Sequence, residues 1–319
     1  MTSELPAIDD LDRRIVDRLR RDGRETNRSM AGAFGVNEAT IAARLRRLEA
    51  HNVVRVVALT DMHRLGFEYL AIGMVSVEAR LVSQVAAEIA AIPQTIFVNV
   101  HTGRYGVSCG VLAEDRLELG RIFGEDIPRV RGVRAARCEL AVDVLRFNSE
   151  FAPLNVSDQG VLCGPKIPPH AIDDQDLDII HALQRDARAS NRSIAADLAV
   201  SEGTVRARLR RMEANHLIRI RAISDLAAFG MDFGAFVGVR VMNGRIPEVA
   251  DRLLGMDPIG VIIQSLGDWD FLLVILATTR DVLLDIVFRQ IQGLDGVGST
   301  EVIEIADVVK HLYTWARLV

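Results

Sequence analysis

The amino-acid sequence contains an internal repeat, and this constrains its fold more than any other feature. The basic segment at residues 37–49 recurs at residues 201–213, and 201 − 37 gives an offset of 164 residues. The same offset places Gly103 on Gly267, and no gap is needed between them. Self-similarity over such a long period predicts two copies of one structural unit joined in tandem.

Each unit is predicted to have two parts. Identity between the copies is dense over residues 8–55 and then thins to glycines and an apolar pattern. A chain of 319 residues also exceeds what one core usually organises. Residues 151–170 contain four prolines and no helical period, which is typical of a linker. We therefore expect five segments, at residues 1–54, 55–151, 152–170, 171–218 and 219–319.

The first part of each unit is predicted to form three helices. Asp9 is well placed to cap the first helix, and Gly35 suits the turn that ends the second. Asn37 and its equivalent Ser201 are strong N-caps for the third helix. Helix, short helix, tight turn and helix is the plan of a winged-helix/helix-turn-helix domain.

The third helix is predicted to have one apolar face and one basic face. Ile41, Leu45 and Leu48 share the face that can be buried. A helix of about a dozen residues fits the major groove of double-stranded DNA, where arginine and threonine hydrogen-bond to bases or phosphates and alanine meets a thymine methyl. Because the formal net charge is −5, DNA would be held by this local patch and not by the overall field. The predicted DNA-contacting residues are Thr40, Ala43, Arg44, Arg46 and Arg47, with Thr204, Arg206, Arg208, Arg210 and Arg211 in the second unit.

Two alternatives stay open for this basic face. Arg44 lies nearer the core edge, so we assign it either to a phosphate contact or to an ion pair with an acidic residue of the first helix. A run of arginines is also commonly just a solvated face, and the three helices would then be a purely structural cluster. Because the whole pattern recurs with its arginines retained, DNA binding is favoured.

The second part of each unit is predicted to be ferredoxin-like. In the first unit a connecting strand at 55–60 precedes strands at 69–77, 95–101, 105–113 and 133–145 and helices at 81–91 and 115–127. The copy follows the same order from residue 233 to residue 310. The predicted fold class is therefore α+β, with two winged-helix/helix-turn-helix domains alternating with two ferredoxin-like βαββαβ domains.

The helical part of both units resembles the N-terminal domain of the Lrp/AsnC (feast/famine) family of transcription regulators. The residues that carry the resemblance are Asp9, Asp12, Ile15, Leu19, Asp22, Gly23, Arg24, Ala31, Val36, Ile41, Arg44, Leu45, Arg47, Leu48 and Glu49, and the second unit repeats the pattern from Asp173 to Glu213. The resemblance implies a cytoplasmic regulator that binds double-stranded DNA, needs no cofactor and catalyses no reaction. It also implies that the ferredoxin-like (RAM) domains bind an amino acid or a related small metabolite and pair, either in a homo-oligomer or as a pseudo-dimer within one chain.

Three positions depart from the family pattern. Asn52 and His216 stand where the family usually has glycine after the third helix, and Ala199 replaces the Gly35 of the first unit. A left-handed backbone is tolerated by asparagine, less well by histidine, and costs alanine about 1 kcal/mol or more. The second helical domain is therefore predicted to be the less well formed.

The hairpin between the second and third strands differs between the units. The second unit reads Gly-Asp-Trp-Asp at 267–270, close to the pattern that lies at the effector pocket of the family, whereas the first unit reads Gly-Arg-Tyr-Gly at 103–106. Two carboxylates can hold the ammonium group of an amino acid, and backbone N–H groups nearby can hold its carboxylate. The alternative is a plain hairpin turn. The effector residues implied are Gly267, Asp268, Trp269, Asp270, Ser299 and Thr300, with Gly103, Arg104 and Tyr105 in the first unit.

Two rival functions remain. Siroheme decarboxylases resemble the same family, and His63 with Arg64 lies where residues for a tetrapyrrole carboxylate would occur, although the second unit has alanines there. A ligand-sensing scaffold without DNA contact is the other rival. The histidines and cysteines lack metal-ligand spacing, and the sequence has no nucleophile elbow, phosphate loop or dinucleotide fingerprint. No apolar run has membrane length, so no membrane partner is expected.

Overall fold

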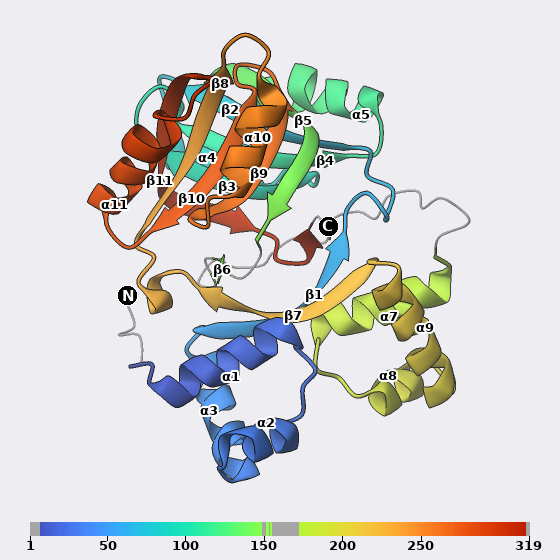
Figure 1. The fold of residues 1–319 in the computed structure, drawn as a ribbon. Helices are drawn as coiled ribbons and strands as arrows, with labels where there is room; N and C mark the ends of the chain where they lie inside the picture. Colours follow the sequence, from blue (N-terminus) through green and yellow to red (C-terminus); the bar gives the residue numbers. More distant parts are fainter. Residues whose placement is uncertain (1–6, 149–150, 153, 155–171, 317–319) are drawn as a thin grey trace.

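The computed structural model describes residues 7–148, 151–152, 154 and 172–316. The predicted linker at 152–170 lies, apart from residues 152 and 154, outside the described residues. A β-barrel covered by helices forms one layer, a small sheet lies beneath it, and two clusters of three helices lie on the far side of that sheet (Figure 1). The predicted α+β class is confirmed.

Both helical domains form from local signals in the sequence. The first contains α1 (Asp10–Arg21), α2 (Asn27–Phe34) and α3 (Glu38–Ala50), and the second contains α7 (Asp174–Arg185), α8 (Asn191–Asp197) and α9 (Glu202–Ala214). Asp9 caps α1 through a reciprocal hydrogen-bonded box with Asp12. The predicted caps of the third helix are confirmed, because Asn37 accepts from the Ala39 N–H and Ser201 accepts from the Thr204 N–H.

The three departures from the family pattern all adopt the left-handed backbone. The φ angles are 52° for Asn52, 53° for His216 and 54° for Ala199, where the first unit has Gly35 at 69°. Ala199 and His216 therefore place two costly conformations in the second domain, against the single tolerated one at Asn52 in the first. These left-handed residues support the predicted difference between the two domains, which itself stays a prediction.

A four-stranded sheet joins the two units beneath the barrel. Its order is β12 (Trp315–Ala316), β1 (Val54–Asp61), β7 (Ile218–Asp225) and β6 (Phe151–Ala152). The antiparallel β1 and β7 pair with Val57 opposite Arg221, and 221 − 57 is again 164. Equivalent residues thus face each other, which places a pseudo-twofold axis of the repeat at this pair.

Each first helix packs on the strand of the other unit. Ala222 of β7 belongs to the same core as Ile15 and Leu19 of α1, and the Arg20 Nη2 donates to Ser224 Oγ at 3.0 Å. Reciprocally, Ala58 of β1 is buried with Ile179 and Leu183 of α7. The two units are therefore interlocked and not merely tethered.

The ferredoxin-like order is confirmed in both units. The first has β2 (Tyr69–Val77), α4 (Val82–Ala90), β3 (Thr95–His101), β4 (Val107–Ala113), α5 (Arg116–Arg121), α6 (Ile127–Arg129) and β5 (Val133–Phe147). The second has a 3-10 turn (Ala227–Phe229), β8 (Phe233–Val241), α10 (Ile246–Leu254), β9 (Ile259–Leu266), β10 (Phe271–Ala277), α11 (Arg280–Asp285) and β11 (Val297–His311). The second helix of each unit differs from the prediction, because π-helical segments at Ile122–Asp126 and Ile286–Ile291 interrupt it.

The eight longer strands close into one barrel, in the order β10-β8-β11-β3-β4-β2-β5-β9. The strand pairs β3–β11 and β5–β9 are the two seams at which one unit joins the other, so the ferredoxin-like domains pair within the chain as an intrachain pseudo-dimer. Lys310 crosses one seam to donate to the Ala90 carbonyl at 3.0 Å, and its equivalent, Arg146, crosses the other to donate to the Met256 carbonyl at 2.6 Å. Each cation thereby binds near the C-terminal end of a helix of the other unit, where the helix dipole favours it.

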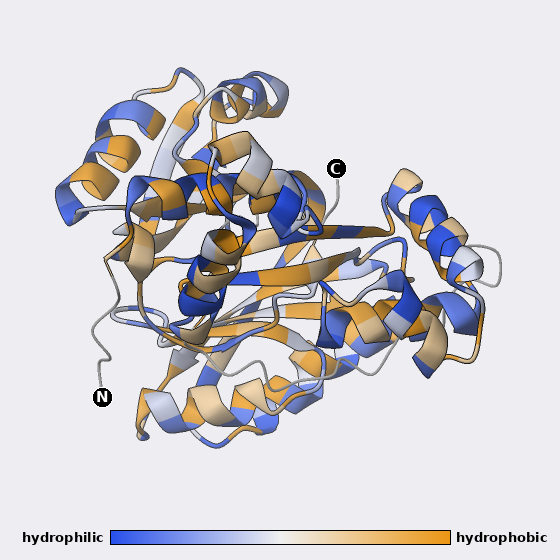
Figure 2. Ribbon diagram, turned by 90° about the horizontal axis from the view of Figure 1, so that it is seen from below, coloured by the Kyte–Doolittle hydropathy of each residue, from blue (hydrophilic) through white to orange (hydrophobic). Residues whose placement is uncertain are grey.

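The strands are rich in buried apolar residues. Seen from below, the strands are largely hydrophobic whereas the helices alternate hydrophobic and hydrophilic residues along their length (Figure 2). Seven residues of β2, Leu70 to Ser76, are buried in succession, as expected for a strand covered on both faces. No helix in the described part of the chain has the length and hydropathy to span a membrane.

Candidate functional site

The third helix of each helical domain presents the predicted faces. In α3, Ile41 and Leu48 are fully buried and Leu45 nearly so, while Thr40, Ala43 and Arg46 are exposed. Both α3 and α9 belong to the helical clusters on the side of the small sheet that faces away from the barrel (Figure 1). The barrel therefore lies on the opposite side of the small sheet from both helices.

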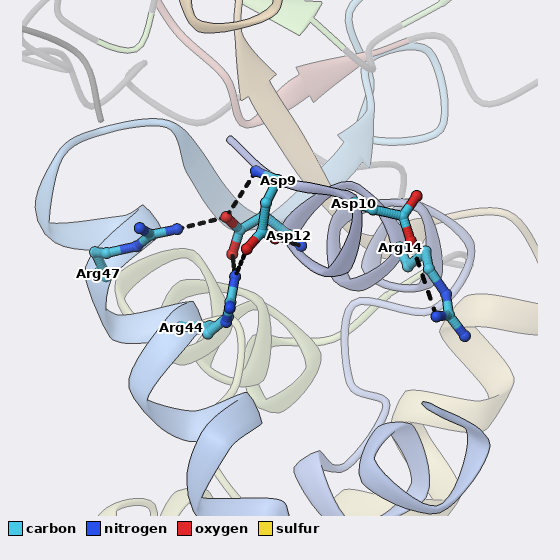
Figure 3. A network of polar contacts seen from close by, with 6 residues as sticks. All are labelled: Asp9, Asp10, Asp12, Arg14, Arg44 and Arg47. Atoms are coloured by element: carbon cyan, nitrogen blue, oxygen red, sulfur yellow. Dashed lines mark hydrogen bonds and ion pairs between the residues drawn. The ribbon is translucent and has the colours of Figure 1, made fainter. Parts of the chain in front are cut away.

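Two of the predicted DNA-contacting arginines are held by the first helix (Figure 3). Arg44 pairs with Asp9 and donates to Asp12 Oδ1 at 3.1 Å, and Arg47 pairs with the other carboxylate oxygen of Asp12. The Arg44 guanidinium lowers the pKa of Asp9 to about 2. For Arg44 this confirms the ion-pair alternative. Arg47 is held as well, because the fully buried Asp12 carboxylate binds its guanidinium, and its predicted contact with DNA stays a prediction.

The second unit repeats this arrangement. Arg208 donates to Asp173 at 2.8 Å and to Asp176 Oδ1 at 2.9 Å, and Arg211 pairs with Asp176 Oδ2. Asp176 is fully buried, like Asp12. Arg208 and Arg211 thus fix α9 to α7, and their predicted contact with DNA stays a prediction.

The remaining basic residues of α3 and α9 show which part of each helix could still contact DNA. Arg46 and Arg210 are exposed and form no ion pair with any residue in the described ranges. Arg206 is exposed too but pairs with Glu202 one turn away at 2.5 Å. Thr204 is partly buried and shares a hydrogen bond with Ser201 at 2.8 Å. The best-placed residues for contact with DNA are therefore fewer than predicted, with Arg46 and Arg210 foremost.

The two helical domains also hold each other through reciprocal contacts, which sequence reasoning missed. Arg24 donates to the Ala189 carbonyl at 2.7 Å, and its equivalent Arg188 donates to the Gly23 carbonyl at 2.9 Å. Both arginines are in the repeat, but nothing local indicates that each binds the backbone of the other copy. These contacts fix the relative position of α3 and α9.

The hairpin of the second unit is satisfied from within the protein. The Asp268 carboxylate accepts from Arg137 Nε at 3.3 Å and lies 3.4 Å from the Tyr105 hydroxyl. Asp270 Oδ2 accepts from the Val241 N–H at 2.7 Å. Both carboxylates that were predicted to hold an ammonium group therefore already have partners.

Glu139 occupies the backbone donors of the same hairpin. Its carboxylate accepts from the Asp268 N–H at 2.8 Å and from the Trp269 N–H at 3.3 Å. Gly267 makes this possible, because a Cβ there would collide with the Glu139 carboxylate. Burial raises the pKa of Glu139. Glu139 thus stands where the sequence analysis placed the carboxylate of an amino acid, and it lies too far away in sequence to be anticipated.

The hairpin of the first unit lies against that of the second. Tyr105 is buried and packs edge-on against Trp269 with ring centroids 6.2 Å apart. Gly103 has a φ of 109°, and Arg104 pairs with Glu301 at 3.7 Å. The structure therefore brings both predicted hairpins together at one end of the barrel.

The two predicted hydroxyl residues, Ser299 and Thr300, lie within β11. Ser299 pairs with Arg240 of β8, and Thr300 pairs with Val239. The Thr300 hydroxyl is buried and has no hydrogen-bond partner among the described residues. It is the one predicted effector residue with an unused polar group at a buried position.

A pocket of about 460 Å³ lies between the barrel and the small sheet. Its walls are mostly apolar and include Met62, Phe97, Phe236, His311, Tyr313 and Trp315, and no lysine or arginine of the described chain lines it. Burial lowers the pKa of His311 to about 4. The side chain is only partly buried by accessible surface, and it lines the pocket. His63 and Arg64, the residues considered for a tetrapyrrole, do not line it. Within the described ranges no cluster of histidine, cysteine, aspartate and glutamate could hold a metal.

Comparison with known families agrees with this arrangement. The model of the AsnC-type helix-turn-helix domain matches residues 8–49 and 172–213, and that of the Lrp/AsnC ligand binding domain matches residues 234–314. The chain belongs to the Lrp/AsnC family. Its domains are those of a transcription regulator with DNA-binding helix-turn-helix domains and a ligand-binding domain.

Two curated relatives each align with less than half of this Lrp/AsnC protein. An uncharacterized HTH-type transcriptional regulator of Pyrococcus abyssi is 28% identical over 141 residues, which cover 44% of this chain and 89% of that protein. The regulatory protein AsnC of Escherichia coli is 25% identical over 134 residues, covering 41% of this chain and 88% of that protein. A solved structure similar to the whole tandem arrangement is that of the siroheme decarboxylase NirDL, with a TM-score of 0.67, 15% identity, and coverage of 95% of this chain and 93% of that one. At this identity the likeness concerns the fold alone.

Proposed function

We propose that this Lrp/AsnC-family protein is a sequence-specific DNA-binding regulator that acts in the cytoplasm and responds to an amino acid or a related small metabolite. The observation that carries the DNA-binding part is the pair of helices α3 and α9, on which Arg46 and Arg210 are exposed and form no ion pair with any described residue, while neighbouring arginines anchor the helices. The reciprocal Arg24 and Arg188 contacts support a fixed spacing between the two helix-turn-helix domains. We expect half-sites separated by about one helical turn, roughly 34 Å, or by multiples of it.

Replacing both Arg46 and Arg210 with alanine is expected to weaken DNA binding roughly tenfold to a hundredfold and to flatten its salt dependence. Each arginine lost from a base or phosphate contact removes a charge-assisted hydrogen bond and a site of counterion release. Binding to genomic fragments should be measured by fluorescence anisotropy at several salt concentrations. The matched control is Arg129→Ala with Arg289→Ala, which removes the same charge from exposed positions on the RAM domains.

Equal affinity and salt slope in the two double variants would refute the assignment of Arg46 and Arg210 to the groove. Failure of the unaltered protein to bind any genomic fragment would favour a ligand-sensing scaffold instead.

For the effector we propose an exchange at the second hairpin, in which the carboxylate of an amino acid replaces that of Glu139 on the Asp268 and Trp269 N–H groups. Burial raises the pKa of Glu139, because desolvation disfavours its charged form, and the two backbone donors that it binds can bind another carboxylate in its place. The unused Thr300 hydroxyl supports a polar ligand at this part of the RAM pair.

Glu139→Ala is expected to tighten amino-acid binding about tenfold, because the variant removes the internal competitor while keeping both backbone donors. Asp268→Ala, which removes the candidate ammonium partner, is expected to weaken binding by a similar factor. Titration calorimetry with a panel of the twenty amino acids measures both. If some amino acid binds and Glu139→Ala leaves its affinity unchanged, the exchange at this hairpin is wrong.

Siroheme decarboxylation is the weaker reading of the same fold. A tetrapyrrole carries several carboxylates, which a protein normally meets with arginine or lysine. The pocket between barrel and sheet has neither among its described walls, and it includes Asp232 and Asp307. The chemistry of this pocket thus supports the regulator over the enzyme.

A further inference from the structure

Two ion pairs join the RAM domains at the hairpin end of the barrel. The pseudo-twofold axis of the repeat relates one pair to the other, and equivalent residues in the two units carry opposite charges. Arg137 of the first unit pairs with Asp268 of the second at 3.3 Å, and Arg104 of the first pairs with Glu301 of the second at 3.7 Å. The offset of 164 makes Asp268 the equivalent of Arg104 and Glu301 the equivalent of Arg137. The first unit thus supplies both cations, and the second unit supplies both anions, at the same two structural positions.

This reversal gives the three conceivable pairings different electrostatics. A first unit paired with the first unit of another chain would place Arg104 against Arg137 at both ends of the pseudo-twofold. Two second units would place Asp268 against Glu301 at both ends. Only a first unit paired with a second unit brings opposite charges together, and like charges at these distances are repulsive.

Glu139 adds a second asymmetry at the same end. Its equivalent in the second unit is Ile303. In a pairing of two second units, Ile303 would meet the hairpin, and the Asp268 and Trp269 N–H groups would lose the carboxylate that accepts from them. A lost partner at a buried donor is costly, so this pairing is disfavoured twice.

Two cationic side chains that cross the seams do not discriminate in this way. Lys310 and Arg146 are equivalent residues, both are cationic, and both donate to backbone carbonyls. Both units offer backbone carbonyls at these positions, so the hydrogen bonds of Lys310 and Arg146 are compatible with any of the three pairings. Among the charged contacts across the seams that join described residues, those that discriminate between partners therefore lie at the hairpin end.

We propose that the Arg137–Asp268 and Arg104–Glu301 pairs, with Glu139, select the pairing partner of each RAM domain. They direct a first unit onto a second unit and reject self-pairing of equivalent units from two chains. This goes beyond the regulator function and does not depend on it, because the partner surface concerned is that of the RAM domains alone.

The test inverts one side of each pair in the full chain. The double variant Arg137→Glu with Glu301→Arg places Glu against Asp268 and Arg against Arg104 within the chain, whereas two chains that pair equivalent units regain opposite charges at all four contacts. We expect its self-association constant to rise roughly tenfold over that of the unaltered protein, measured by sedimentation velocity over a concentration series at low salt. At 1 M NaCl the difference should vanish, because all four side chains are at least partly exposed.

A compensating variant provides the matched control. Adding Arg104→Asp and Asp268→Arg to the double variant restores opposite charges within the chain. The four positions then still carry two cationic and two anionic side chains in total. Its self-association should return to that of the unaltered protein. An unchanged association constant in the double variant, or a quadruple variant that associates as strongly as the double, would overturn the proposal.

Discussion

Asp12→Ala is expected to lower the free energy of unfolding of the first helical domain by about 2–4 kcal/mol. Asp12 is fully buried and accepts hydrogen bonds from the Asp9 N–H and from two arginines of α3. Removing the carboxylate leaves both guanidinium groups without their shared partner and opens the capping box of α1. Because Arg44 and Arg47 keep 29% and 40% of their side-chain surface exposed, water can partly replace Asp12, which favours the lower end of the range. Amide hydrogen exchange should be used, because it can assign the loss of stability to residues 10–50. Global denaturation would average the loss over several domains.

Asp176→Ala is the matched variant in the second unit, since Asp176 holds Arg208 and Arg211 in the same way. It should destabilise α7 to α9 and leave α1 to α3 protected. Arg46→Ala serves as the negative control, because this exposed side chain makes no ion pair within the described part of the chain. Equal protection in Asp12→Ala and Arg46→Ala would show that the buried carboxylate does not anchor the recognition helix.

Acidification from pH 7 to pH 4 is expected to destabilise the barrel through His311, with a loss of about 2 kcal/mol at pH 5 and about 3 kcal/mol at pH 4. Burial lowers the pKa of His311 from its ordinary 6.5 to about 4, and the side chain makes no hydrogen bond with any described residue. Between these two pKa values the unfolded chain binds a proton at His311 that the folded chain does not. The contribution of neutral His311 to the free energy of unfolding is therefore fully present above pH 6.5 and is lost as the pH falls toward 4. Urea unfolding at pH 7, 6, 5 and 4 measures the slope.

His311→Phe should flatten this dependence, because phenylalanine suits the apolar pocket and does not titrate. His101 contributes in the same direction, since burial also lowers its pKa, although its imidazole hydrogen-bonds with the Glu304 carbonyl and with Ser108. The difference between the unaltered protein and His311→Phe therefore isolates His311. Parallel stability curves for the two proteins from pH 7 to pH 4 would contradict the assigned titration.

The structure of each helical domain could be predicted almost entirely from local sequence. N-caps such as Asn37 act within three residues, and the left-handed exit at Asn52 follows from the end of α3. The predicted strands at 69–77 and 95–101 match β2 and β3 at both ends. The π-helical segments were missed because an i to i+5 turn leaves the apolar pattern of a helix nearly unchanged.

The functional surface was predicted less well, because its chemistry depends on partners that are distant in sequence. Arg47 was expected to face DNA, and its ion pair with Asp12, 35 residues away in sequence, was not foreseen. The second hairpin was expected to await a ligand, but Glu139 lies 129 residues before Asp268 and fills its donors. A buried aspartate and a buried glutamate look like any other acidic residue in a sequence that is already acidic overall.

The sequence by itself determined that this protein is built from two equivalent units, each with a helix-turn-helix domain and a ferredoxin-like domain, since repeats, caps and apolar periods are local properties of the chain. Only the tertiary structure decided that the units close one barrel within the chain, that half of the basic face anchors the recognition helices, and which residues of each unit meet across the pseudo-twofold. The reason is that pairing depends on the charge and shape of two surfaces brought together from positions more than 100 residues apart, and the register of such surfaces is fixed by packing and not by local preference.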